Sequence, residues 1–448
     1  MKYVPLFSIL ALALLISACN QTAQKDLNAM YPSKVEVKER NGKYSLYVNG
    51  KPFFVEGAGV DDGDIAALAA HGANALRTWN DSEVHLPEDH VLNIAKENGL
   101  MVMMGLPMGK ERHGFDYDDE KAVQEQFEMI SQKILKMKDH PALLGWGIGN
   151  ELNLRSTNMK VWDAVEEIAA FIQKEDGNHP VTTMLAGIGK EEADYIGKNC
   201  PSLDFLSLQI YGAIVNLPDM IRDAGYTGPY LVTEWGATGH WEVPLTSWDA
   251  PIEPTSTEKA RDFRHRYETV ILADSTNCLG SFVFLWGQKQ ERTPTWYGLF
   301  TEAGKTTEAV DVMQYLWTGD WPENRAPQIH GLMLDGKTST DNISLSPGQE
   351  VTVSYLFEDV DGDTVKIRFE ILKESTDLKD GGDLEERPAS LNVEILSLDD
   401  TRATIVSPSE PGAYRLFIYG SDGHHHAATG NVPFIIQKKN QSRKTQQA

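Results

Sequence analysis

Cysteine is scarce in this sequence, because the 448 residues contain only Cys19, Cys200 and Cys278. Cys19 falls in an N-terminal segment treated below, so two thiols remain for the body of the chain, far apart in the sequence. Two such thiols do not make a disulfide framework, even in an oxidising compartment. We therefore expect Cys200 and Cys278 to be small, buried apolar side chains.

Basic charge is also in short supply. The chain has 41 Lys and Arg residues against 65 Asp and Glu residues, with a net charge of −24 and an isoelectric point near 4.9. Nucleic acids and anionic lipid surfaces are bound through a basic face, so this balance argues against both as partners. A neutral polymer such as a glycan is compatible with it, and acidity that only aids solubility explains it equally well.

The sequence has no glycine-rich phosphate-binding turn after its first predicted strand, and no cofactor motif elsewhere. An open, doubly wound sheet that binds a dinucleotide would need that turn. We therefore disfavour this fold and expect no cofactor. The sequence carries no signal for the oligomeric state.

The N-terminal apolar run from Val4 to Ile16 is too short to form a typical transmembrane helix. With Lys2 before it and the lipobox-like Leu15-Ile16-Ser17-Ala18-Cys19 at its end, residues 1–18 have the form of a lipoprotein signal peptide. We expect cleavage before Cys19, lipidation of Cys19 and a tether over residues 19–34, with plain secretion as the alternative. Asn20 favours anchoring in a bacterial outer membrane.

What the sequence does contain is a long alternation of short apolar strands and amphipathic helices. Eight such units in a row predict an α/β fold, a (β/α)8 TIM barrel, over residues 35–320, preceded by a hairpin that plugs the barrel floor. The predicted strands are 51–59, 74–79, 100–106, 144–148, 181–185, 203–211, 230–234 and 280–286. The predicted helices are 64–71, 87–98, 120–138, 160–175, 191–198, 217–224, 258–274 and 306–317.

A proline-containing linker over residues 321–327 precedes a region with a different pattern of apolar and polar residues. Residues 328–438 alternate apolar and polar side chains between turns, which predicts an antiparallel, immunoglobulin-like β-sandwich. The predicted strands are 350–358, 365–372, 391–396, 403–406, 414–419 and 432–436, and residues 439–448 form a polar tail. The acidic turn holding Asp359, Asp361 and Asp363 is a solvated turn or a Ca²⁺ site, although it lacks the distal Glu of a full calcium loop.

Two of the predicted barrel strands end in a glutamate. Glu151 and Glu234 follow apolar runs that are typical of strands buried on both faces. Because parallel barrel strands end at one mouth, both carboxylates are expected there, and a pair of carboxylates is what cleavage of a glycosidic bond requires.

The motifs resemble those of the retaining glycoside hydrolases of clan A, and most closely the barrel domain of glycoside hydrolase family 2. The similar pieces are Val48 to Phe54, Gly72 to Trp79, Gly149-Asn150-Glu151 and Thr233-Glu234-Trp235-Gly236. The chain lacks the large N-terminal β-domains that usually precede that barrel, so it also resembles single-barrel members of family 5 and β-1,3-glucan-active families.

The resemblance implies that Glu151 is the acid/base and Glu234 the nucleophile. It also implies that Arg77 orients the nucleophile, that Asn150 binds the sugar 2-hydroxyl, that Tyr211 hydrogen-bonds the nucleophile and that Trp286 stacks under the sugar. Trp79, Trp235, Trp241 and Trp296 are further aromatic candidates for sugar contacts, because sugar faces pack well on such rings.

These features together predict a retaining hydrolase of a β-linked glucan or mannan. A transglycosylase, in which a sugar replaces water as acceptor, is the alternative within the same chemistry. A surface glycan-binding lipoprotein without catalysis is disfavoured, because binding alone does not require both carboxylates.

Overall fold

A computed structural model describes residues 32–79 and 87–437 of the chain. The predicted signal peptide, Cys19, most of the predicted tether and the predicted C-terminal tail lie outside the described residues. The described residues divide into two compact units. The first holds the described residues up to 209 together with 218–234 and 274–282, and the second holds 210–217, 235–273 and 283–437. Each unit has an apolar core of its own.

The predicted barrel is confirmed, because eight strands close in the order β10-β11-β4-β5-β6-β7-β8-β9. The neighbouring strands from β4 to β10 pair in parallel. The strands are β4 (Val55–Gly59), β5 (Ala75–Arg77), β6 (Met101–Leu106), β7 (Leu143–Asn150), β8 (Val181–Ala186), β9 (Phe205–Gln209), β10 (Tyr230–Trp235) and β11 (Cys278–Val283).

The first predicted strand, residues 51–59, is wrong as a single element. The structure divides it at Phe54 into β3 (Lys51–Phe53), which pairs antiparallel with β2 (Lys43–Val48), and the barrel strand β4. β2 also pairs with β1 (Val35–Arg40). Side chains of β1 and β2 pack with those at the starts of barrel strands, including Val35, Leu46 and Leu144. The hairpin therefore covers the barrel floor, as predicted.

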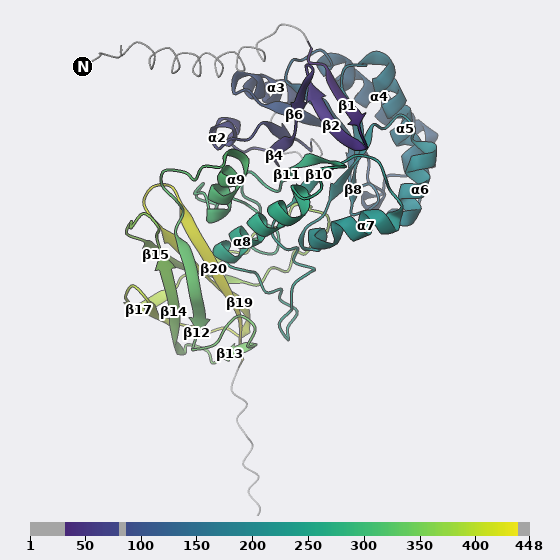
Figure 1. The fold of residues 1–448 in the computed structure, drawn as a ribbon. Coiled ribbons are helices and arrows are strands. Elements are labelled where there is room, and N and C mark those ends of the chain that lie inside the picture. The colour runs from purple at the N-terminus through teal and green to yellow at the C-terminus, as the bar shows by residue number, and fades with distance from the viewer. Residues whose placement is uncertain (1–31, 80–86, 438–448) are drawn as a thin grey trace, which may run out of the picture. The chain divides into compact units, whose positions relative to one another are not determined.

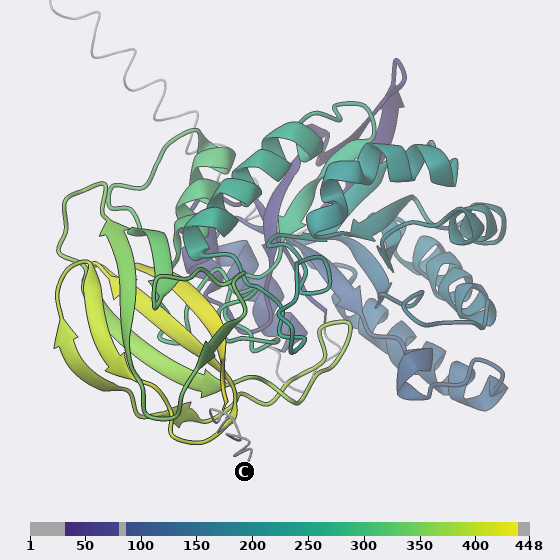
Figure 2. The same ribbon diagram turned by 90° about the horizontal axis from the view of Figure 1, so that it is seen from below.

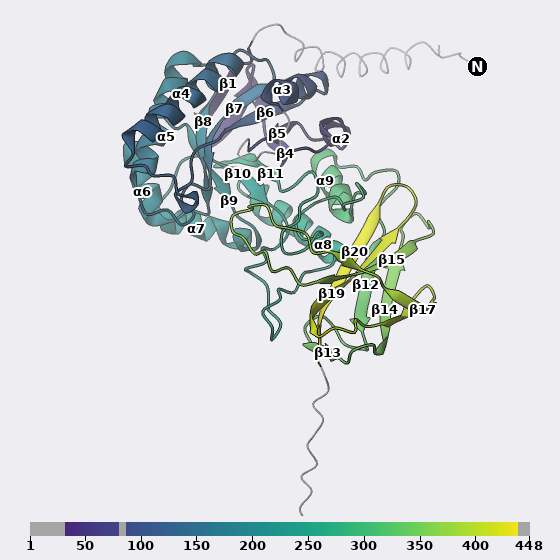
Figure 3. The same ribbon diagram turned by 180° about the vertical axis from the view of Figure 1, so that it is seen from behind.

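The helices of the first unit lie outside its strands, with α4, α5, α6 and α7 following one another around them (Figures 1 and 3). They are α2 (Ile65–Ala70), α3 (Glu88–Glu97), α4 (Glu120–Met137), α5 (Lys160–Glu175), α6 (Lys190–Asn199) and α7 (Leu217–Ala224). Asp64 and Asp119 cap α2 and α4 by accepting backbone N–H groups, as aspartates at helix starts commonly do.

The second unit contains the helices of the last two βα repeats. α8 (Ser256–Arg266) starts with a capping box between Thr255 and Glu258 and continues into the π-helical turn η4 (Tyr267–Ile271). α9 (Glu308–Thr318) ends at Gly319, whose φ of 81° suits a glycine C-cap. Two short 3-10 helices of the described residues are η2 (Glu111–His113), in the first unit, and η3 (Gly212–Asn216), in the second.

The rest of the second unit is a pair of β-sheets, whose strands Figure 2 shows in green and yellow. One sheet has the order β12-β14-β18-β17 and the other β13-β20-β19-β15-β16. The strands are β12 (Gln328–Leu334), β13 (Ile343–Leu345), β14 (Glu350–Glu358), β15 (Lys366–Lys373), β16 (Ser390–Leu391), β17 (Glu394–Leu398), β18 (Arg402–Val406), β19 (Gly412–Ser421) and β20 (Ala427–Ile436).

The sequence did not predict β12 or β13, and the sheets are not wholly antiparallel because β13 pairs parallel with β20. Alternate residues of these strands meet in one apolar core that includes Val353, Ile405 and Val432. Cys200 and Cys278 are free and buried, as expected. Within residues 32–79 and 87–437, no helix combines the length and apolar character that crossing a membrane requires.

Candidate active site

Both candidate catalytic glutamates lie beside irregularities at the ends of barrel strands. The pairing of β7 with β8 skips Gly149, and the pairing of β10 with β9 skips Thr233. Such bulges bend a strand and re-aim the side chains after them, and they recur next to active sites. Gly149 has a φ of 67° and Glu151 a φ of 53°, so the chain turns sharply where Glu151 leaves the strand.

Arg77 connects the two strand ends. Its side chain is fully buried, and Nη1 donates to the backbone oxygen of Thr233 and to Oε1 of Glu234, both at 3.1 Å. Nη2 donates to Oδ1 of Asn150 at 2.9 Å. A guanidinium cannot deprotonate in a protein, so this contact holds a permanent positive charge against the Glu234 carboxylate.

Asn150 has its amide orientation fixed by two donors. Arg77 Nη2 and Gln209 Nε2, the latter at 2.6 Å, both donate to Asn150 Oδ1. Because a guanidinium has only donors, the oxygen of the amide must face Arg77, and the NH₂ group points away from it. The Asn150 side chain is therefore held in one orientation as a donor.

Trp79 makes a polar contact that the sequence did not predict. Its indole N–H donates to Oε1 of Glu234 at 2.6 Å, and the Arg77 guanidinium lies 4.5 Å from the ring centroid. Gly59 gives the ring its space, because a Cβ there would lie 2.2 Å from the indole. Trp79 therefore helps to hold Glu234, and its predicted sugar contact stays a prediction.

The two glutamates differ in their electrostatic surroundings. Burial, reinforced by the negative charge of Glu234, raises the pKa of Glu151 to about 7, while Arg112 and Lys110 act against this rise. Glu234 instead accepts two N–H donors, from Arg77 and Trp79. Glu151 is thus suited to hold a proton near neutral pH, whereas Glu234 is held in place by a cation and an indole N–H.

The remaining predicted contacts belong to the second unit. The ring of Tyr211 makes edge contacts with Trp241, Phe284 and Tyr297. Its predicted hydrogen bond to the nucleophile stays a prediction. Trp241 is 59% exposed, whereas Trp296 is buried and donates its indole N–H to the backbone oxygen of Thr238.

Trp235 and Trp286 are both fully buried. Trp235 packs against Phe263 and Tyr267, and Trp286 makes an edge contact with Phe300 at 5.1 Å between centroids. These contacts show how both indoles pack, and they do not test a contact with a sugar. Their substrate contacts therefore stay predictions.

The acidic turn of the sandwich is organised by its own hydrogen bonds. Asp359 Oδ1 accepts the backbone N–H groups of Asp361 and Asp363. Asp361 and Asp363 in turn accept the backbone N–H of Arg325 and the side-chain amide of Asn324. Across the described ranges no cluster of three or more His, Cys, Asp or Glu side chains is arranged to hold a metal ion. The carboxylates fasten the linker, which favours the turn interpretation over the calcium one.

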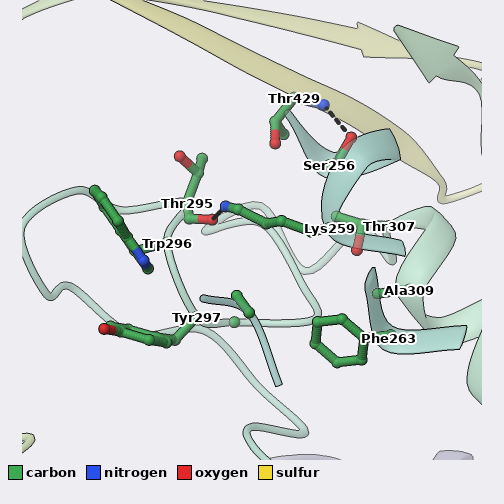
Figure 4. Close-up of a pocket in the computed structure, with 11 residues that line it drawn as sticks. Ser256, Lys259, Phe263, Thr295, Trp296, Tyr297, Thr307, Ala309 and Thr429 are labelled. Carbon is green, nitrogen blue, oxygen red and sulfur yellow. Dashed lines mark hydrogen bonds between the residues drawn. The ribbon is translucent and has the colours of Figure 1, made fainter. Parts of the chain in front are cut away.

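A small cavity in the second unit is lined by Ser256, Lys259, Thr295 and Thr429, among others (Figure 4). Lys259 donates to the backbone oxygen of Thr295 at 2.6 Å, and Ser256 accepts the backbone N–H of Thr429. The cavity measures about 10 Å³, which is room for about one water molecule. It is too small for a sugar.

Gln209 is the functional candidate that the sequence did not reveal. It is the last residue of β9, whereas the predicted strand ran two residues further, to Tyr211. A polar residue closing an apolar strand is the same signal that marked Glu151 and Glu234. Gln209 shows this pattern too, but the predicted strand ended at Tyr211, so Gln209 was not recognised as a strand-end residue.

Comparison with known proteins bears on the family resemblance and on the fold. Residues 35–240 match the family described as glycosyl hydrolases family 2, TIM barrel domain, which confirms the resemblance drawn from the motifs. No curated protein matches the chain.

Two solved structures share the fold. A calcium-binding mutant of Bacteroides uniformis β-glucuronidase 2 is 13% identical, with a TM-score of 0.50 over 89% of this chain and 47% of that one. A β-D-glucuronidase of Dictyoglomus thermophilum is 18% identical, with a TM-score of 0.50 over 65% of this chain and 54% of that one. The chain thus spans about half the length of these proteins, and at such identities the likeness concerns the fold alone.

Proposed function

We propose that this chain, whose barrel is similar to that of family 2 glycoside hydrolases, is a retaining glycosidase that cleaves a β-linked glucan or mannan. The observation that carries the proposal is the buried hydrogen-bonded group around Glu234. Arg77 and Trp79 both donate to its Oε1, and Arg77 also donates to Asn150, the residue before Glu151. A carboxylate that accepts two N–H donors, together with a second carboxyl whose pKa is raised, is the arrangement that double displacement uses.

In the first step, Glu234 attacks the anomeric carbon while Glu151 gives its proton to the glycosidic oxygen. The bond between that carbon and oxygen breaks, and the leaving group departs with the proton. Asn150, whose NH₂ group points away from Arg77, supplies a donor for the sugar 2-hydroxyl, a contact that strengthens in the transition state.

In the second step, water attacks the same carbon on the face that the leaving group vacated. Glu151 takes a proton from this water, and Glu234 is released as a carboxylate. Ester formation at Glu234 removes a negative charge that raises the pKa of Glu151, so Glu151 ionises more readily at the stage when it must act as the base.

The test uses azide, which can replace a missing catalytic carboxylate. With an activated aryl β-glycoside, Glu234→Ala should lose at least about 10³-fold in kcat, and azide should restore turnover by forming the α-glycosyl azide. Glu151→Ala should instead give the β-glycosyl azide, because azide then attacks the glycosyl-enzyme. The NMR coupling of the anomeric proton distinguishes the two products.

Glu97→Ala, which removes an exposed carboxylate from α3, is the matched control and should retain full activity. Glu234→Gln keeps acceptors for Arg77 and Trp79, so it separates loss of charge from loss of fold. Full activity in Glu234→Ala, or identical azide products from both variants, would overturn the proposed mechanism.

The sugar is to be identified with a panel of β-glucans, β-mannans and aryl glycosides, with product masses as the readout. β-Glucuronides belong in the panel, since the two structural neighbours named above are β-glucuronidases. Sugar acceptors should be added in the same assay, because a transglycosylase would give products longer than its substrate.

We also propose that the mature chain is anchored in a bacterial outer membrane by lipid on Cys19, as the lipobox-like sequence suggests. In cells, wild type should partition into detergent with a mass increase of a diacylglyceryl group and an acyl chain. Cys19→Ser should remain at precursor mass without lipid. An unmodified mature chain in the aqueous phase would contradict this proposal.

A further inference from the structure

A surface cleft lies in the first unit between the segment that follows β6 and the segment that follows β7. It measures about 380 Å³, which is within the range of about 300–1,000 Å³ typical of ligand sites. Its lining includes Glu111, Phe115, Asp116 and Asp118 from the first segment and Thr157 and Asn158 from the second. The second segment begins at Glu151 itself.

Glu111 holds the two segments together. Its Oε2 accepts the Ser156 hydroxyl at 2.7 Å and the backbone N–H groups of Thr157 and Asn158 at 2.8 and 3.0 Å. Its Oε1 accepts the Thr157 hydroxyl at 2.7 Å. These bonds lower the pKa of Glu111 to about 2, so the carboxylate stays charged and the shape of the cleft is fixed before a ligand arrives.

The segment that lines the cleft also contacts the backbone of Glu151. Arg112, the residue after Glu111, approaches the backbone oxygen of Glu151 at 3.5 Å through Nη1. The acid of a glycosidase must stand next to the glycosidic oxygen, so the leaving group lies on the acid's side of the scissile bond. A cleft joined to the acid in this way is placed for the leaving group.

The lining fits a neutral sugar. Phe115 packs over Gly109, where a Cβ would lie 2.1 Å from the ring, and it is half-buried in the wall. Aromatic rings pack on sugar faces, and carboxylates and amides bind hydroxyl groups.

The lining also disfavours an anion, because it carries three carboxylates, those of Glu111, Asp116 and Asp118. Lys160 pairs with Asp118 at 2.7 Å but does not line the cleft. Lys110 and Arg112, whose charges act on Glu151, do not line it either. Negative charge therefore predominates where a ligand would bind.

We propose that this cleft binds the leaving-group portion of the substrate and accepts a neutral, hydroxyl-rich sugar there in preference to a uronic acid. The proposal rests on the proposed function and adds the substrate class on one side of the scissile bond. It places selectivity in Phe115, Asp116 and Asp118, which are outside the proposed catalytic group.

The experiment is reactivation of a trapped glycosyl-enzyme. A 2-deoxy-2-fluoro aryl glycoside of the sugar found in the panel forms a long-lived ester on Glu234, and an acceptor in the cleft then removes the glycosyl group. Cellobiose or mannobiose should speed reactivation at least about 10-fold over water and show saturation. Glucuronic acid at equal concentration should give less than a third of the effect of glucose.

Phe115→Ala should lower the reactivation by the neutral disaccharide about 10-fold relative to reactivation by water, which does not occupy the leaving-group site. Phe115→Leu is the second variant, in case the smaller side chain unsettles the fold. Asp116→Asn with Asp118→Asn should raise reactivation by glucuronic acid at least about 5-fold. Asp89→Asn with Asp139→Asn removes the same charge from exposed positions elsewhere and should leave the acceptor preference unchanged.

Equal reactivation by glucose and glucuronic acid, or no effect of either Phe115 variant, would overturn the inference about the cleft and leave the proposed function standing. Failure of every fluoroglycoside in the panel to label Glu234 would overturn both. The two failures are distinguishable by the mass of the labelled protein before any acceptor is added.

Discussion

Glu151 is the residue whose chemistry depends most on its neighbours. Because burial and the charge of Glu234 raise its pKa to about 7, it holds a proton under conditions in which an exposed glutamate would be ionised. Turnover of substrates that need protonation of the leaving group should fall tenfold per pH unit above about pH 7. Aryl glycosides with very acidic leaving groups should show a weaker decline, since they depart without a proton.

The charge contribution to this pKa can be measured directly. In Glu234→Gln the pKa of Glu151 should fall below its wild-type value, because the like charge is removed while the burial remains. A ¹³C NMR titration of the glutamate carboxyls in both proteins provides the measurement. An unchanged Glu151 titration would mean that Glu234 does not act on it.

Trp79 and Trp235 form a matched pair of buried tryptophans with different bonding. Trp79→Phe removes the 2.6 Å hydrogen bond to Glu234, and hydrogen bonds to charged groups contribute about 1.5–3 kcal/mol. We expect kcat/KM to fall about 10- to 100-fold. Trp235→Phe removes an indole N–H that has no hydrogen-bond partner among the described residues, so kcat/KM should change less than about 3-fold. An equal fall in kcat/KM in both variants would mean that Trp79 acts only through packing and not through its hydrogen bond to Glu234.

At the scale of elements, the end of β7 depends on Gly149. Its φ of 67° is unfavourable for a residue with a Cβ by about 1–2 kcal/mol, and a Cβ there would lie 2.4 Å from Leu152. Gly149→Ala should therefore lower the free energy of unfolding by more than this amount and reduce kcat through displacement of Glu151. Chemical denaturation and steady-state rates provide the two readouts.

Gly304 is the control for this prediction, because its φ is 71° and a Cβ added there would meet no atom within 4 Å. Gly304→Ala introduces the same backbone strain without the steric clash. It should lose about 1–2 kcal/mol of stability and no activity. If Gly149→Ala behaved identically, the bulge at the end of β7 would have no part in positioning Glu151.

Helix α8 is fastened within the second unit by a buried ion pair. Lys259 donates to Glu253 at 2.5 Å, and Glu253 also accepts the Thr293 hydroxyl and the side-chain amide of Asn431 in β20. Burial opposes ionisation of Glu253, but the charges of Lys259 and Arg415 outweigh it and lower its pKa.

Lys259→Met should lower the unfolding free energy by about 3–5 kcal/mol, because it leaves a buried carboxylate without its cation. Adding Glu253→Gln to Lys259→Met should recover part of this loss. Lys190→Met removes the exposed partner of Asp194 and should change stability by less than about 1 kcal/mol. Thermal and denaturant unfolding would measure the stability of all three variants. A loss of stability in Lys259→Met no larger than that in Lys190→Met would contradict the stabilising role of the buried ion pair.

At the scale of the whole molecule, two buried carboxyls make stability depend on pH. Burial raises the pKa of Asp311 to about 7, as it does for Glu151. A raised folded-state pKa disfavours the ionised form in the native state, so the stability that these two groups contribute is fully present below about pH 4 and is lost as pH rises through 7. For Asp311 the loss is at most roughly 4 kcal/mol, from about 1.4 kcal/mol per pKa unit.

Asp311→Asn tests this dependence. Its side-chain oxygen can still accept the backbone N–H of Ala326, a bond of 2.7 Å in the wild type. The variant should therefore be more stable than wild type at pH 8 and not at pH 4, as measured by unfolding free energies at both values. A difference of the same size at both pH values would exclude titration of Asp311 as the cause.

The sequence by itself determined the order of the elements and the position of two glutamates at strand ends. Strands such as β7 are buried along their whole length, so an unbroken apolar run identifies them, and the carboxyl ends of parallel strands share one mouth. The floor hairpin was equally readable, because Asn49-Gly50 is a strong turn signal.

Only the tertiary structure decided which side chains touch. Two hydrogen bonds of the site join residues far apart in the sequence, namely Trp79 with Glu234 and Gln209 with Asn150. The bulges at Gly149 and Thr233 likewise depend on how each strand pairs with its neighbour. The break at Phe54, the short β13 and the use of the acidic turn to hold the linker likewise follow from partners elsewhere in the chain. Local patterns report whether a residue faces the core, whereas hydrogen-bond partners depend on the packing of distant segments, which no local pattern encodes.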